Sequence, residues 1–286
     1  MTQGYSNVSS LNSLFANIFE DAVFVARERN IMTSLVTVFN DQTGDQTRTN
    51  STYPQISASS VTEADDFSNP TQFGKTSITT LTPGEIMAQV LLTDRRIETD
   101  AQAARNDASL ELGMAIADKI ESDLLGNFSS LTGGTIGNSG STLTWGHFFA
   151  ARAVLRGGKV PGPYVAVLHE YQWYDLAKAV APTATVTNIP AGMIDDIARR
   201  WYVGTIADVD IYTTANITRT GGTAAVGGMF NRAAIAFDNR RAPRLEPERD
   251  ASKRAWELNI TAKYAHGVWR PTFGVQIKSD VTTPTS

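Results

Sequence analysis

The residue types that most often carry out chemistry are sparse in this sequence. Histidine occurs three times, at His147, His169 and His266, and no two of them share the i, i+4 spacing that places two metal ligands on one helix face. Cysteine is absent, which excludes disulfides, thiol nucleophiles and cysteine-ligated metal centres. The sequence therefore predicts no metal site and no cofactor.

Carboxylates and glycine motifs also fail to form a recognisable site. Asp65–Asp66 and Asp195–Asp196 are neighbours, and adjacent side chains on an extended chain point to opposite sides. The segment Phe73-Gly74-Lys75-Thr76 is similar to the end of a phosphate-binding loop, but Asn69 stands where that motif needs its first glycine. No serine lies in a G-x-S-x-G elbow. These absences predict a protein that is not an enzyme.

Composition describes a globular chain with an acidic balance. The chain has 286 residues, of which 42% are hydrophobic and 19% charged, enough for one or two domains with a sizeable core. No apolar run approaches the ~20 residues that cross a bilayer, and no signal peptide is visible, so we expect folding in a cytosol. A net charge of −4 argues against a dedicated nucleic-acid binder, although residues 240–286 hold nine basic and five acidic groups.

Two helices stand out near the ends of a long polar segment. Apolar spacing predicts a helix over 11–29 and a strand over 35–39. The strongest helix is predicted over 100–125, with Thr99 or Asp100 as its cap and Gly126 at its end. Its apolar stripe consists of Ala104, Ala108, Leu112, Ala115, Ile116, Ile120 and Leu124. Such a helix spans roughly 40 Å, which is long for a chain of this size.

Between these helices the composition changes. Residues 41–82 contain sixteen Ser or Thr and few large apolar side chains, and 75–82 are rich in β-branched residues. The pattern predicts a two-armed ribbon with a turn near 63–70, followed by a strand over 86–92. An isolated two-stranded ribbon is marginal in water, so this one must lie on its own globule or on a neighbouring subunit. A flexible surface loop is the alternative.

The rest of the chain predicts an α/β unit and a C-terminal return. Residues 132–142 are expected to form a flexible Gly/Ser/Thr loop. Helices are then predicted over 145–156, 170–180 and 191–201, and strands over 164–168, 202–206, 209–213 and 228–237. Pro243 and Pro247 argue against regular structure in the charged run that follows. Two last strands are expected over 255–264 and 272–277.

This order of pieces resembles the major capsid proteins of tailed bacteriophages, which share the Hong Kong 97 (HK97) fold. The segment 81–94 looks like that family's passage from its extended loop (E-loop) to its spine helix. Glu248-Arg249-Asp250, 256–261 and Trp269-Arg270-Pro271-Thr272 look like its charged loop and terminal strands. The resemblance implies an α+β, HK97-like capsid fold.

The resemblance also implies a division of the chain. It gives an N-terminal arm at 1–40, the E-loop at 41–85, a first P-domain part with the spine helix at 86–144, an A-domain at 145–240, and P-domain return strands with the charged loop at 241–286. Contacts between subunits would then involve the ribbon and the charged run. The candidate residues are Phe67, Phe73, Lys75, Arg240, Arg241, Arg244, Glu246, Glu248 and Arg249.

The function implied is that of a structural shell protein of the virion. It would self-assemble into hexamers and pentamers of an icosahedral head around double-stranded DNA, which it contacts non-specifically. Its other partners would be a scaffolding protein, a portal and a decoration protein, with no membrane involved. Lys75, the one lysine of the ribbon, is the candidate for the cross-link that some relatives make. The alternatives are an encapsulin-type nanocompartment, an α/β enzyme with a disordered ribbon, and a surface or tail protein.

Overall fold

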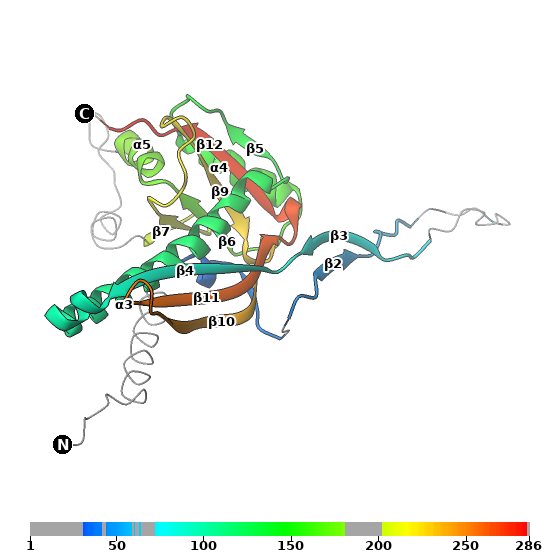
Figure 1. Cartoon of the computed structure of the whole chain (residues 1–286). Helices are drawn as coiled ribbons and strands as arrows, with labels where there is room; N and C mark the ends of the chain where they lie inside the picture. The colour runs from blue at the N-terminus through cyan, green and yellow to red at the C-terminus, as the bar shows by residue number, and fades with distance from the viewer. Residues whose placement is uncertain are drawn as a thin grey trace, which may run out of the picture.

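The computed structural model describes residues 31–41, 44–58, 60, 63, 72–180 and 202–284. Within these ranges the strands form a four-stranded sheet, a six-stranded sheet and a two-stranded ribbon that projects from the body (Figure 1). The helices predicted over 11–29 and 191–201, most of the ribbon turn, and the pairs Asp65–Asp66 and Asp195–Asp196 lie outside the described residues.

The four-stranded sheet carries the long helix on one face. Its order is β1-β10-β11-β4, with β1 at Thr37–Phe39, β4 at Gly84–Thr93, β10 at Ile235–Asp250 and β11 at Ala255–Val268. Helix α3 runs from Asp94 to Gly126 and packs Leu112 and Ile116 against Leu258 and Ile260 of β11. Burying this apolar stripe holds the helix to the sheet.

Helix α3 begins six residues before its predicted start, because nothing between Asp94 and Asp100 breaks a helix and an acidic residue suits its first turn. It ends at Gly126 as predicted, and the 3₁₀ turn η1 follows at Asn127–Ser130. Ala108, Leu112, Ile116 and Leu124 of the predicted stripe are buried, whereas Ala115 is exposed.

Strand β10 corrects the expectation that its prolines prevent regular structure. β1 pairs with it at Ala236–Asp238 alone, so beyond Asp238 β10 is an edge among the described strands. An edge strand tolerates residues without an N–H. The pairing register with β11 also shifts between Arg241 and Arg244, and this irregularity takes up Pro243.

The six-stranded sheet lies above the first one in Figure 1. Its order is β5-β12-β9-β6-β8-β7. Its strands are β5 (Thr135–Gly137), β6 (Tyr164–Leu168), β7 (Tyr202–Ile206), β8 (Val209–Thr213), β9 (Ala224–Asn231) and β12 (Gly274–Asp280). Helices α4 (Trp145–Gly157) and α5 (Glu170–Val180) complete this unit. The predicted bounds of β6, α5, β7 and β8 are confirmed.

Strand β5 occupies 135–137 of the segment 132–142 that was predicted as a flexible loop, and the prediction was wrong for these three residues. It pairs in parallel with β12, and the glycines allow the two backbones to approach closely. Gly137 has φ +78°, and a Cβ there would overlap the carbonyl oxygen of Lys278. A Cβ on Gly133 would lie 2.6 Å from the carbonyl oxygen of Gly274.

The two last strands, expected together, lie in different sheets, because β11 belongs to the four-stranded sheet and β12 to the six-stranded one. Two of the places where the chain crosses between the sheets are η2 (Arg232–Ala234) and η3 (Pro271–Phe273). The two crossings touch: the backbone N–H groups of Trp269 and Arg270 both donate to the carbonyl oxygen of Ala234, at 2.7 and 3.0 Å.

The N-terminal described segment and the ribbon flank this crossing. A single helical turn, α2 (Met32–Leu35), precedes β1, where the sequence predicted one strand over 35–39. The ribbon consists of β2 (Arg48–Thr52) and β3 (Thr76–Leu81), paired antiparallel. Its two-armed form is therefore confirmed at the base.

Candidate inter-subunit surface

The base of the ribbon is fastened to the crossing between the two sheets. Asn50 Nδ2 and Thr79 Oγ1 donate to the carbonyl oxygen of Trp269, at 2.5 and 3.2 Å. Leu81 is buried beside Ala236 and Ala265. Both arms of the ribbon are thus tied to Trp269, the residue that follows β11, which fixes the direction in which the ribbon leaves the body.

A buried ion cluster supports the same place. Asp238 Oδ2 accepts from Arg48 Nε at 2.8 Å and from Arg240 Nη2 at 2.7 Å, and the side chains of Asp238 and Arg240 are fully buried. Arg48 also pairs with Asp41 and lies 4.3 Å above the ring of Phe39. The hydrogen bonds to Asp238 and Asp41 raise the pKa of Arg48 against the opposing effect of burial. Arg48 therefore joins the ribbon to the four-stranded sheet.

Beyond its base the ribbon exposes apolar side chains. Tyr53 and Phe73 stack on each other across the two arms, with ring centroids 4.5 Å apart and an angle of 3° between the rings. They are nevertheless 52% and 62% exposed, and Ile56 and Ile78 are also exposed. These exposed large apolar residues make the ribbon a candidate contact surface.

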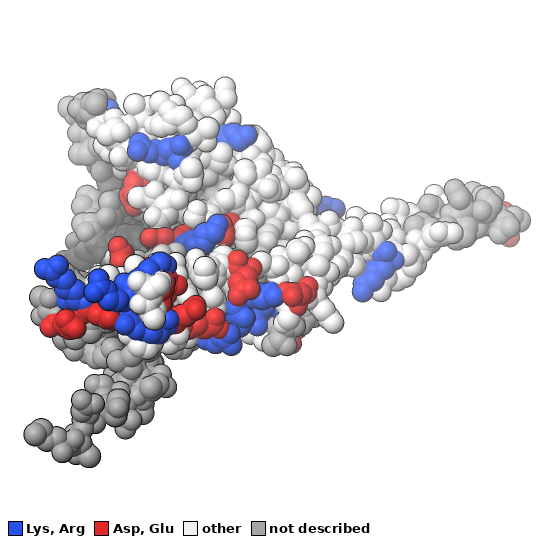
Figure 2. All heavy atoms as spheres, in the orientation of Figure 1, with Lys and Arg blue, Asp and Glu red and all other residues white. Residues whose placement is uncertain are grey.

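Charged residues form a second surface on β10 and its neighbours. Figure 2 shows basic and acidic side chains crowded together at the end of the molecule that holds α3 and the β10–β11 turn, whereas little charge lies on the described ribbon. We call Arg241, Arg244, Glu246, Glu248 and Arg249 the charged strip. Arg244, Glu246, Glu248 and Arg249 are exposed, and Arg241 is half-buried.

Much of the charged strip is already paired within the subunit. Arg249 holds both oxygens of Asp94 at 2.7 Å, and its guanidinium lies 5.6 Å from the Trp256 ring. Arg241 pairs with Glu85, and Arg244 pairs with Glu246. Exposed pairs such as these contribute about 0–1 kcal/mol each, so they can exchange partners at low cost.

The predicted contact residues therefore fall into three groups. Phe73 and Lys75 lie exposed on the ribbon, and the charged strip lies exposed or half-buried on β10. Phe67 lies outside the described residues. Arg240 was misplaced: it is buried and paired to Asp238, because the irregular register after Asn239 puts it inside.

Tyr53 was not among the predicted contact residues. Aromatic residues are few in the ribbon, so each of them, Tyr53 included, could have been taken as a candidate contact residue. Arg48 was missed as well, and no local pattern marks a residue whose partner lies 190 positions away.

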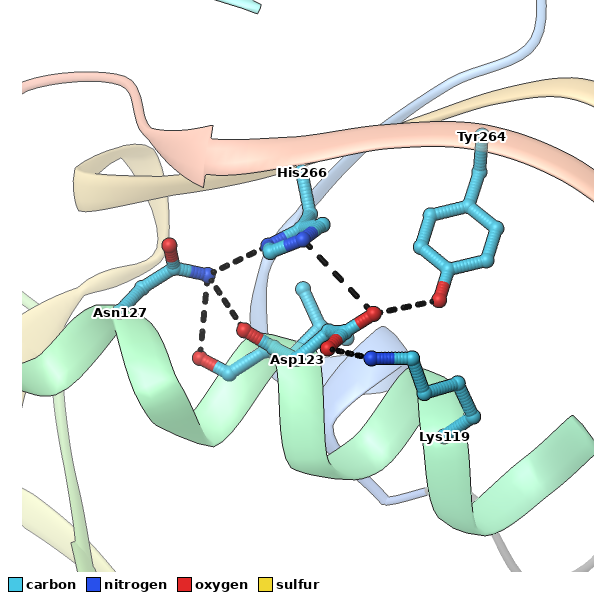
Figure 3. A network of polar contacts seen from close by, with 6 residues as sticks. Lys119, Asp123, Asn127, Tyr264 and His266 are labelled. Atoms are coloured by element: carbon cyan, nitrogen blue, oxygen red, sulfur yellow. Dashed lines mark hydrogen bonds and ion pairs between the residues drawn. The ribbon is translucent and has the colours of Figure 1, made fainter. Parts of the chain in front are cut away.

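A polar network ties the end of α3 to β11 (Figure 3). Asp123 Oδ1 accepts from Lys119 Nζ and Asp123 Oδ2 from the Tyr264 hydroxyl, both at 2.7 Å. Partial burial raises the pKa of Asp123, but the hydrogen bonds from Lys119 and Tyr264 outweigh it and hold that pKa below its ordinary value. Burial and the hydrogen bond to Asp123 raise the pKa of Tyr264.

His266 and Asn127 complete this network. Asn127 Nδ2 lies 3.2 Å from His266 Nδ1 and donates to the carbonyl oxygens of Asp123 and Leu124, which closes the last turn of α3. Burial lowers the pKa of His266, although the charge of Asp123 opposes it, so the ring is neutral at pH 7. The side chains point at one another across the helix and the strand, which is the arrangement of a structural tie.

The other two histidines lie at helix starts. Thr144 Oγ1 accepts from the backbone N–H of His147, and the His147 ring accepts from the backbone N–H of Thr144, which caps α4. His169 Nδ1 accepts from the backbone N–H of Tyr171 at 3.1 Å at the start of α5. Burial lowers the pKa of His169 below its ordinary value. Each histidine thus has a role in local structure.

A cleft of about 490 Å³ opens between the ribbon base and the turn that holds η3. Its walls are 50–52 and Ile78 on the ribbon side and Thr132 with 270–273 on the other, so neither a carboxylate nor a histidine lines it. Across the described residues, no group of three metal-ligating side chains gathers at one point. No helix within the described ranges is long and apolar enough to span a membrane.

Solved phage capsid structures have the same fold. The model is similar to a structure from Mycobacterium phage Che8, with a TM-score of 0.64, 17% identity, and 87% of this chain and 90% of that chain covered. It is similar to the capsid of Ralstonia phage GP4, with a TM-score of 0.67, 11% identity and 88% of each chain covered. It is also similar to the capsid of cyanophage Pam1, with a TM-score of 0.65, 10% identity, and 87% of this chain and 89% of that chain covered. The HK97-like capsid fold predicted from the order of pieces is confirmed.

A comparison with curated protein sequences gave no significant match. The model of the phage capsid protein family matches residues 88–277, from β4 through α3 and both sheets to β12. That match spans well over half of the chain and agrees with the shared fold. The chain therefore belongs to the phage capsid protein family and is a structural protein of the phage head.

Proposed function

We propose that this protein is the subunit that self-assembles into hexamers and pentamers of an icosahedral head enclosing double-stranded DNA. The observation that carries the proposal is the projecting ribbon, whose Tyr53 and Phe73 are more than half exposed although they are large apolar rings. Exposed apolar surface of this kind stabilises association when a partner covers it. Capsid relatives form shells from many copies, which supports a second copy of this chain as that partner.

The charged strip takes the second role in this proposal. Basic and acidic side chains mixed along one edge strand suit contacts between capsomers, where complementary charges set register and partner choice more than affinity. The four-stranded sheet with α3 serves as the P-domain and the six-stranded sheet as the A-domain, which β12 joins. A scaffolding protein, a portal, a decoration protein and non-specifically held DNA complete the proposed partners, and no step requires catalysis by this chain.

The experiment separates assembly from folding. Purified Phe73→Ala protein, Phe73→Tyr protein and wild type are compared by negative-stain microscopy for closed particles and by circular dichroism for folding. Phe73→Ala removes half of the exposed ring stack and is expected to lower particle yield at least tenfold while leaving the thermal midpoint unchanged. Phe73→Tyr keeps the ring and should assemble like wild type. If Phe73→Ala forms particles at the wild-type yield, the ring pair is not an assembly contact.

A deletion tests the ribbon as a whole. In this variant residues 55–71 are removed, and Pro54 is joined to Gln72 by a short Gly-Ser linker. The change keeps β2, β3 and the hydrogen bonds to Trp269. The shortened subunit should stay folded and fail to form shells. Shells of normal size from this variant would refute the ribbon's role, and an unfolded subunit would show that the ribbon belongs to the core.

A further inference from the structure

A buried carboxylate connects the spine helix to the first described segment of the chain. Glu121, on α3, is 2% exposed, and its Oε2 accepts the backbone N–H of Met32 at 3.1 Å from 89 residues away. Its second oxygen, Oε1, is buried and has no hydrogen-bond partner among the described residues. An ionised carboxylate in such a place is only partly compensated, and burying a charge is costly.

Residues 31–36 are also attached by apolar packing and by the hydrogen bond from Arg232 Nε to the Val36 carbonyl oxygen. Met32, Leu35 and Val36 are buried in the cluster that also contains Leu124 and Phe128. Ile31, which precedes the helical turn, offers no side-chain cap. Glu121 therefore supplies an acceptor for one of the backbone N–H groups that the first turn of a helix leaves unpaired.

We propose that Glu121 is a proton-dependent latch that holds residues 31–36 against the spine helix. The protonated side chain sits in this site without a buried charge, whereas the ionised one must be desolvated. Acid therefore tightens the attachment of this segment, and alkali loosens it. Because 31–36 continue directly into β1, the latch also sets how firmly β1 begins its pairing with β10.

The electrostatic surroundings agree with this direction. Burial raises the pKa of Glu121 to about 7, although the backbone N–H groups of Met32 and Ile31 lower it, and the charge of Asp118 raises it further. A carboxyl whose folded pKa lies above its ordinary value contributes most stability at low pH and loses it as pH rises through the folded pKa. The window here runs from about pH 4.5 to about pH 7.

Other charged groups near this contact have partners of their own. On α3, Lys119 and Asp123 belong to the network with Tyr264 and His266 of β11. At η2, Arg232 Nε donates to the carbonyl oxygen of Val36 at 3.0 Å, and an arginine keeps its charge throughout the window. The helical turn Met32–Leu35 contains no titratable side chain.

Hydrogen–deuterium exchange of the full chain tests the latch. Exchange of a peptide covering 31–39 is followed from pH 5 to pH 8.5 and divided by that of an exposed reference peptide, which removes the intrinsic pH effect. In wild type the protection should fall on the order of a hundredfold as pH rises from 5 to about 7 and should then level off, as expected from a shift of this size. Glu121→Gln cannot ionise and should stay protected at every pH.

Glu111→Gln provides the control, because Glu111 is an exposed carboxylate on the same helix. It should keep the wild-type pH response. The proposal is overturned if wild-type protection of 31–39 does not change with pH, or if Glu121→Gln keeps the wild-type response. A carboxyl stretch near 1,700–1,720 cm⁻¹ gives an independent measure: the band lost in Glu121→Gln should titrate near pH 7, and titration near pH 4.5 would also overturn the proposal.

Discussion

Replacing Asp238 by Asn is expected to destabilise the subunit more than any other single change at the ribbon base. The carboxylate of Asp238 is fully buried between Arg48 and Arg240. Arg240 is fully buried as well, and its Nε and Nη1 have no partner among the described residues. Without the charge of Asp238, Arg240 becomes a buried cation that has lost its ion-pair partner.

The magnitude follows from burial. Breaking a buried ion pair by removing one partner costs about 3–5 kcal/mol. Domains of this kind are stable by about 5–15 kcal/mol, so the Asp238→Asn protein retains a fraction of the original stability. Arg48→Met should cost less, about 1.5–3 kcal/mol, because Arg240 still compensates Asp238 and Arg48 is partly exposed. The double change Asp238→Asn with Arg240→Met should be more stable than Asp238→Asn alone, since it removes the stranded charge.

Urea unfolding of the unassembled subunit, followed by tryptophan fluorescence, measures these differences. Asp208→Asn is the matched control: Asp208 pairs with Arg152 at 3.4 Å, but its side chain is 81% exposed, so the change should cost less than about 1 kcal/mol. Equal losses for Asp238→Asn and Asp208→Asn would refute the argument from burial. So would a double variant that is less stable than Asp238→Asn.

Three further predictions concern other parts of the molecule. Gly137→Ala should lower the free energy of unfolding by more than the ~1–3 kcal/mol of backbone strain, because its Cβ would overlap the Lys278 carbonyl oxygen. Gly140→Ala, at φ +91°, has open space around its Cβ and should show the backbone strain alone in the same urea unfolding assay. Tyr264→Phe removes a donor to Asp123, whose lowered pKa gives stability that is present above its ordinary value of 3.8 and lost as pH falls. The fall in the urea midpoint between pH 6 and pH 3 should therefore be smaller in the variant than in wild type. Arg244→Glu reverses an exposed charge of the charged strip. It should slow particle formation at low salt, measured by light scattering, without changing the thermal midpoint of the subunit. An unchanged rate of particle formation would show that Arg244 is not part of the contact between capsomers.

Local sequence patterns predicted most elements of the fold because they depend on local physics. The apolar stripe of α3 and the β-branched runs of β6 and β8 each report directly on burial. The prolines of β10 led to a wrong prediction, because the hydrogen bond that a proline removes matters only where the strand has a partner on both sides. Whether it has one is a property of the sheet and not of the local sequence. The glycines before β5 misled for a similar reason, since close approach to β12 and flexibility require the same residue type.

The candidate contact surface could be outlined from the sequence, but its details could not. A polar ribbon and a mixed-charge run are visible in the sequence. The inward turn of Arg240 depends on the register shift between β10 and β11, and the stack of Tyr53 on Phe73 depends on the pairing of arms 20 residues apart. Glu121 looks like any surface acid of an amphipathic helix until the segment that covers it is placed.

The backbone carbonyl and N–H of Trp269 connect the ribbon to the joint between the two sheets. The carbonyl holds both arms of the ribbon, and the amide holds Ala234, where the chain crosses between the two sheets. A pull on the ribbon would therefore reach the joint between the sheets through Trp269, and it would reach β10 through Arg48 and Asp238. In an assembled shell, strain could then pass from subunit to subunit through the ribbons and this joint.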